Sequence, residues 1–204
     1  MLYCKLLLKE MKHRLRVFII SAVAFVIMFH INGYVVGKLE YLYVLLALIS
    51  CTTILSEDEI DFLVIGHIQL PKVFILRFIA SVLTVTAIPF IWILIFTNEN
   101  RPMKAAFSFV VTIVIIAAIG AFFRAVLKNT LLAIISSLFV FTCFLISAEF
   151  GLFSPFGAMS IANIKSFYLN RCVWLSFSVI LIMISYFILL SKNKLSVLKK
   201  KLKI

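Results

Sequence analysis

Two neighbouring apolar stretches in the middle of the chain decide its fold. Residues 103–148 read MKAAFSFVVTIVIIAAIGAFFRAVLKNTLLAIISSLFVFTCFLISA, with Lys104, Arg124 and Lys128 as the charged residues. On each side of Lys128 the apolar run is about as long as the ~20 residues that a helix needs to cross a bilayer. The pattern therefore predicts two membrane-spanning helices joined by a very short connection.

The same signal recurs along most of the 204 residues. Hydrophobic residues make up 64% of the chain and charged residues 14%, well below the roughly 25% of soluble domains. This composition excludes a soluble enzyme and a disordered chain. It predicts an all-α membrane protein with six transmembrane helices, at about 17–36, 39–55, 72–97, 103–126, 130–148 and 172–190.

Two local features predict how the third and fourth spans are shaped and packed. Pro89 removes one backbone hydrogen bond inside the third span and is expected to kink it. In the fourth span, Ala117, Ala118, Gly120 and Ala121 form a stretch of small residues that permits close helix packing.

Basic residues flank the six-span domain, which we place at 17–191. Residues 1–16 are expected to form an interfacial amphipathic helix, because Lys5, Lys9 and Lys12 lie opposite an apolar face. The tail at 192–204 carries six lysines and no acid, so we expect it to lie on the anionic inner leaflet rather than to bind nucleic acid.

The distribution of the positive charges predicts the orientation in this chain of net charge +12. If both termini are cytoplasmic, fifteen of the twenty Lys and Arg residues face the cytoplasm, which is the side where such residues accumulate in membrane proteins. An even number of spans agrees with this arrangement. We therefore expect a multi-pass protein with both ends inside the cell.

The connection between the second and third spans is more than a linker. Ser56 can cap a short helix in a capping box with Glu59. The segment at about 57–71 combines acids with apolar side chains on the cytoplasmic side, which favours a docking element for a soluble partner over a solvated helix cap. The residues expected to dock are Glu57, Asp58, Glu59, Asp61, Phe62, Leu63, Ile65 and His67.

The outer connection at about 149–170 is long, apolar and broken by Gly and Pro. Irregular backbone at membrane depth must be shielded by protein, so we expect a re-entrant segment that dips into the outer leaflet. Glu149 and Arg171 are placed to pair at the outer ends of the fifth and sixth spans. Arg124 and Lys128 are expected to snorkel to the inner interface.

No motif indicates catalysis, a metal or a cofactor. The sequence has no P-loop, no H-E-x-x-H and no G-x-S-x-G, and its histidines are far apart. His30 lies inside the first span, where a polar ring needs a partner. It either fixes helix packing through a hydrogen bond or contacts a proton or substrate in a transport pathway.

The order of these parts resembles the membrane subunit of type 2 ATP-binding-cassette exporters, in the compact six-span bacterial form. The resemblance rests on the interfacial N-terminal helix, the six spans, the coupling helix at 57–71 and the re-entrant segment before the last span. The closest local match runs from Glu57 to Arg77, with an acidic start, an apolar helix, Pro71 and then a basic residue. The Gly-Thr pair often found after the acids is absent.

The resemblance implies a permease subunit, without a nucleotide site of its own, in a bacterial cell membrane. A separate ATPase subunit would bind ATP and dock at the coupling helix. A second permease copy, or a related permease, would complete the pathway for an amphipathic or hydrophobic substrate such as a peptide. The first and fifth spans are the expected contact between copies, with Ser136 and Ser137 hydrogen-bonding across it, and the fourth span is the competing surface.

Two other functions stay open. A substrate-binding membrane subunit of a vitamin importer also has six spans in about this length, but its cytoplasmic loops are shorter. An intramembrane enzyme of the prenyl-protein protease type needs paired glutamates, an arginine and histidines inside its spans, and Glu57 and Glu59 lie at the membrane edge instead.

Overall fold

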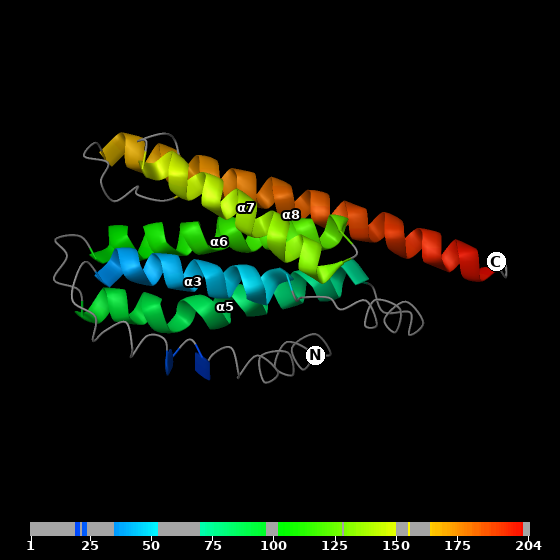
Figure 1. Ribbon diagram of the computed structural model, residues 1–204, viewed down its shortest axis with the longest axis horizontal. Helices are drawn as coiled ribbons and strands as arrows, with labels where there is room; N and C mark the ends of the chain where they lie inside the picture. The colour runs from blue at the N-terminus through cyan, green and yellow to red at the C-terminus, as the bar shows by residue number, and fades with distance from the viewer. Residues whose placement is uncertain are drawn as a thin grey trace.

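The protein is a bundle of long helices (Figure 1). The computed structural model describes residues 19–20, 22–23, 35–52, 70–96, 102–127, 129–149, 155 and 164–201. Its long helices are α3 (Val35–Thr52), α5 (Leu70–Phe96), α6 (Pro102–Val126), α7 (Thr130–Glu149) and α8 (Ile164–Lys201). These ranges contain no strand, and the predicted all-α class is confirmed for them.

Four of the described helices are long and apolar enough to cross a membrane, over Pro71–Ile95, Met103–Val126, Thr130–Ser147 and Phe167–Lys192. They correspond to the third, fourth, fifth and sixth predicted spans. α3 adds a shorter apolar segment, Tyr43–Thr52, within the predicted second span. This part of the chain therefore has the character of a multi-pass membrane protein.

Several predictions concern residues outside this part. They are the interfacial helix at 1–16, nearly all of the first span at 17–36, the coupling helix up to residue 69 and, apart from Pro155, the predicted re-entrant segment at 150–163. Pro71 itself is described, as the second residue of α5. A proline is well tolerated there, because the first turn of a helix needs no intrahelical N–H donor. Pro71 thus helps to start α5 instead of only ending the segment before it.

The last helix is longer at both ends than the predicted sixth span of 172–190. α8 begins at Ile164, so residues 164–170 are regular helix and not part of an irregular outer segment. The physical reason lies in the sequence: within the outer connection at 149–170, glycine and proline occur only at 151–157, and residues 164–171 contain neither. Its 38 residues would measure about 57 Å, which exceeds the ~30 Å hydrocarbon core. Figure 1 shows the C-terminal part of α8 reaching beyond the other helices.

α6 is the centre of the bundle, with α3, α5, α7 and α8 packed around it (Figure 1). Of the residues in the apolar part of α6, 72% are buried, against 17% in α7 and 28% in α8. Small residues make this possible. A Cβ added at Gly120 would lie 3.2 Å from the carbonyl oxygen of Leu48 on α3, and Ala117, Ala118 and Ala121 are fully buried. The close packing predicted for this stretch is confirmed, and Gly120 makes it against α3 of the same chain.

Candidate functional site

The most polar point among the described helices is a buried arginine. Arg171 lies two turns into α8 and is fully buried. Its Nη1 donates to the carbonyl oxygen of Pro155 at 2.7 Å and to Oγ1 of Thr112 on α6 at 3.1 Å. The Thr112 hydroxyl lies 3.2 Å from the same Pro155 oxygen and 3.1 Å from the Ser108 carbonyl, so it can donate to either. The guanidinium thus ties α6, α8 and the connection between α7 and α8 together.

A second cation lies beside this arginine, at the end of the bundle where α6 and α8 begin. Nζ of Lys104, near the start of α6, lies 4.2 Å from the centroid of the Phe167 ring on α8. Cζ of Arg171 lies 5.7 Å from the same centroid. Two cations therefore share one aromatic ring, whose negative face offsets part of their charge. We call this end of the bundle the Lys104 end.

The opposite end of α6 is also tied by cations. Lys192 of α8 donates from Nζ to the carbonyl oxygen of Ala125 at 2.6 Å, and Arg124 donates from Nη1 to the Leu127 oxygen at 3.3 Å. The last carbonyls of a helix have no intrahelical donor and carry partial negative charge, so both contacts satisfy them. Arg124 is only 3% exposed. Its guanidinium is packed into the end of the bundle, where the α6 terminus offers acceptors, so the interaction with the inner interface stays a prediction. Lys128 lies outside the described residues.

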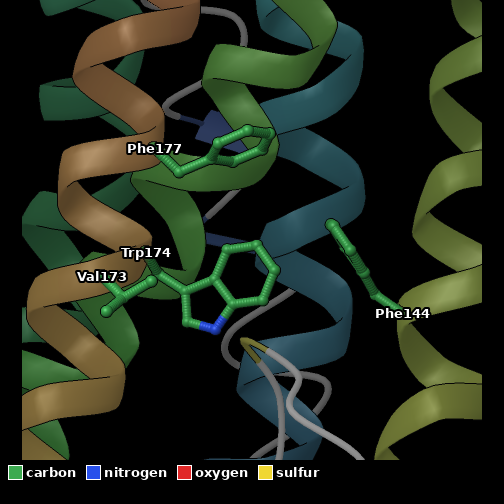
Figure 2. Close-up of a pocket in the computed structure, with 4 residues that line it drawn as sticks. All are labelled: Phe144, Val173, Trp174 and Phe177. Carbon is green, nitrogen blue, oxygen red and sulfur yellow. The ribbon is translucent and has the colours of Figure 1, made fainter.

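An apolar slot lies between α7 and α8 (Figure 2). It has a volume of about 280 Å³ and is lined by Phe144 of α7 and by Val173, Trp174 and Phe177 of α8. The rings of Phe144 and Trp174 meet edge to face, with centroids 5.1 Å apart. Val173 and Phe177 are 45% and 41% exposed, so the slot opens towards the outside of the bundle.

Most hydroxyls within the described spans are turned onto their own helix. Each bonds to a carbonyl four residues earlier, at 2.7–2.8 Å: Ser81, Thr84, Thr86, Ser137, Ser178 and Ser185. A hydroxyl bonded in this way has no donor left for a ligand. Ser137 is also fully buried. It cannot bond across to a second copy, and that part of the predicted contact is wrong.

Of the site residues predicted from the sequence, the structure describes one side chain. Arg171 is buried and bonded as above. Glu149 ends α7, but its side chain lies outside the described part, so the Glu149–Arg171 pair stays a prediction. The other predicted residues also lie outside it: His30 and the docking residues Glu57, Asp58, Glu59, Asp61, Phe62, Leu63, Ile65 and His67.

The described side chains include no group of three or more His, Cys, Asp or Glu close enough to hold a metal. Sequence reasoning missed Thr112, Pro155 and Lys192. The available signals were a threonine in the middle of an apolar span and a lysine just beyond one. Neither signal names a partner.

Comparisons with known proteins give no assignment: no family model, curated protein or solved structure matches the chain. What this part of the molecule offers chemically is therefore read from its geometry alone. Polar ties hold the central helix near its middle, at Thr112, and at its end, at Ala125, and an apolar slot opens towards the outside of the bundle.

Proposed function

We propose that the chain is the permease subunit of an ATP-binding-cassette exporter. It moves an amphipathic or hydrophobic substrate outward, with a peptide as the preferred candidate, and a separate ATPase subunit hydrolyses the ATP. The proposal starts from the order of parts in the sequence. It also depends on the acidic segment at 57–71 lying at the cytoplasmic end of the bundle.

One observation carries the proposal: most of the described cations gather at one end. Lys72 and Arg77 near the start of α5 lie at the same end as Arg124 and Lys192, while Lys104 and Arg171 are at the other. Lys and Arg accumulate on the cytoplasmic side of membrane proteins. By this rule the end where α3 stops and α5 starts is cytoplasmic.

The segment that joins α3 to α5 runs from residue 53 to 69 and contains Glu57, Asp58, Glu59 and Asp61. At the cytoplasmic end it is within reach of a soluble ATPase. Acids followed by Phe62 and Leu63 are unusual beside an anionic leaflet, which attracts basic segments instead. A protein partner that contributes cations and an apolar groove accounts for this composition better than lipid does.

The exposed face of α7 is where a second permease would pack. Leu132, Ile135, Phe139 and Ile146 follow helical spacing, and each is at least 49% exposed. Ala117 and Ala121 on α6 are fully buried within the chain, which favours α7 over the competing contact through the fourth span. A second copy placed against α7 would complete a half-transporter.

Copurification tests the proposal. The tagged chain, extracted from its native membrane in mild detergent, is expected to retain an ATPase subunit with a P-loop. Phe62→Ala with Leu63→Ala should lose most of that ATPase while the chain stays in the membrane. Phe153→Ala with Phe156→Ala removes the same kind of side chain from the outer connection and should keep it.

The alternatives give different results in the same experiment. A vitamin-importer subunit would bring a separate transmembrane scaffold protein with its ATPases. An intramembrane enzyme would bring no ATPase. Equal ATPase recovery with both double variants would contradict docking through the segment at 57–71.

A further inference from the structure

The slot between α7 and α8 has the size and surface of a binding site for a hydrocarbon chain. Its four lining side chains are apolar or aromatic, and its volume is about 280 Å³. An apolar cavity of roughly 150 Å³ stays dry and binds benzene. The slot is nearly twice as large, so it has room for about ten to twelve carbon atoms.

The position of the slot determines where such a chain comes from. Leu169 and Ile180 lie on the face of α8 that carries Val173 and Phe177, and they are 67% and 52% exposed. This face meets lipid if the helices span a bilayer, and the slot opens beside it. Figure 2 shows Phe144 reaching from α7 towards Trp174 and Phe177 of α8, so a chain entering from the bilayer would lie among three rings.

Charge at the Lys104 end indicates which lipid fits. Phe167 and Trp174 are seven residues apart on α8 and fall on one face, about 10 Å apart along the helix. Lys104 lies over Phe167, and Arg171 lies between the two rings in sequence. Lys104 and Arg171 are the charged residues among the described side chains at this end. An acyl chain in the slot would therefore place its headgroup near positive charge.

We propose that the slot formed by Phe144, Val173, Trp174 and Phe177 binds one acyl chain of an anionic phospholipid, whose headgroup lies beside Lys104. This inference rests on the slot and its nearby cations and not on the proposed export function. Arg171 is fully buried and bonded to Pro155 and Thr112, so it contributes through its field, and Lys104, which is only partly buried, makes the direct contact.

Tryptophan fluorescence reads this site directly. The chain has two tryptophans, and Trp92→Phe leaves Trp174 as the reporter. The full-length protein is placed in phosphatidylcholine nanodiscs with a small fraction of phosphatidylglycerol brominated near the middle of its acyl chains, since bromine quenches indole on contact. We expect quenching that saturates at a low mole fraction. Brominated phosphatidylcholine should need a several-fold larger fraction for the same effect.

Three variants distinguish a site from random lipid contact. Val173→Phe fills the slot and should abolish the saturable component. Val179→Phe makes the same change at a 54% exposed position on α8 and should leave it intact. Lys104→Gln should raise the half-quenching fraction of the anionic lipid about fivefold, the factor that one basic residue contributes at a membrane surface. It should leave that of phosphatidylcholine unchanged.

Quenching that rises in proportion to mole fraction, equally for both lipids, would overturn the proposal. So would an identical response from the Val173→Phe and Val179→Phe proteins. If Val173→Phe fails to fold, which circular dichroism would show, Lys104→Gln decides alone: no loss of preference for the anionic lipid refutes the headgroup contact.

Discussion

Replacing Thr112 by valine tests whether the buried Arg171 cluster holds the bundle together. Valine keeps the shape of threonine and removes the hydroxyl. Arg171 then loses the 3.1 Å bond to Thr112 and keeps the 2.7 Å bond to the Pro155 carbonyl. We expect Thr112→Val to destabilise the folded state and to loosen the connection that contains Pro155.

The magnitude follows from the kind of bond that is lost. A hydrogen bond to a charged group contributes about 1.5–3 kcal/mol in proteins generally. Side-chain bonds inside membrane bundles average ~0.6 and reach ~1.7 kcal/mol. Arg171 keeps its shorter bond, so we expect a loss of about 1–1.5 kcal/mol in the free energy of unfolding.

The assay is reversible unfolding of the full-length protein in mixed micelles by titration with sodium dodecyl sulfate, followed by tryptophan fluorescence. Thr84→Val is the matched control. Thr84 is also buried, at 5% exposure, and its hydroxyl bonds only to carbonyls of its own helix, those of Ala80 and Ser81, in the described contacts. Such back-bonding contributes little to stability, so the control should change by less than about 0.5 kcal/mol.

A double-mutant cycle with Arg171→Met isolates the contact itself. In the Arg171→Met background, Thr112→Val should cost clearly less than in the wild type, because only the 3.2 Å contact of the Thr112 hydroxyl with the Pro155 carbonyl is left to lose. Arg171→Met alone removes the bonds from Nη1 to Pro155 and Thr112, and the Thr112 hydroxyl stays as a donor to the Pro155 oxygen. Equal effects of Thr112→Val with and without Arg171 would refute the reasoning, as would equal effects of Thr112→Val and Thr84→Val in the wild-type background.

Three further predictions concern packing and assembly. Gly120→Leu should prevent folding because even a Cβ there lies 3.2 Å from the Leu48 carbonyl oxygen, whereas Gly120→Ala should change stability by no more than ~1 kcal/mol; a stable Gly120→Leu protein in micelle unfolding would contradict this close approach. Lys192→Met should cost about 1 kcal/mol through its lost bond to the Ala125 carbonyl, and an unchanged free energy of unfolding would refute the tie. In native membranes, protein with Cys143 as its only cysteine should form oxidative dimers and protein with only Cys172 should not, although both are exposed; the reverse result would move the contact to α8.

The described spans could be predicted because hydrophobic length alone determines them. An apolar run of about 20 residues has one stable form in a bilayer, a helix that satisfies its own backbone. The ends were harder to predict. The last span was predicted to begin at 172, because the long apolar run starts only after Lys165, Asn170 and Arg171. The helix itself begins earlier, at Ile164. Polar residues can extend a helix when no glycine or proline stops it.

The contacts of the candidate site could not be predicted in the same way. Arg171 is 59 residues from Thr112 and 16 from Pro155, and no local pattern encodes which carbonyl a buried guanidinium will find. The sequence placed Arg171 at an outer helix end beside Glu149, in a reading based on charge alone. Helix packing adds partners that charge does not indicate, because the close contact of α6 with α8 brings a threonine to the arginine.

How a second copy would pack depends on which contacts already use the small residues. Helices in a membrane approach closely through Gly and Ala, and in this chain those of α6 are already used against α3, with Gly120 at the crossing. The exposed face of α7 instead presents Leu132, Ile135 and Phe139. Lipid chains are as apolar as these side chains, so the hydrophobic effect gives such a face little preference for protein over lipid. A contact built on it would therefore be wide and weak by itself. A permease pair of this kind would need a further tie outside the bilayer, and an ATPase pair held through the acidic segments at 57–71 would supply one.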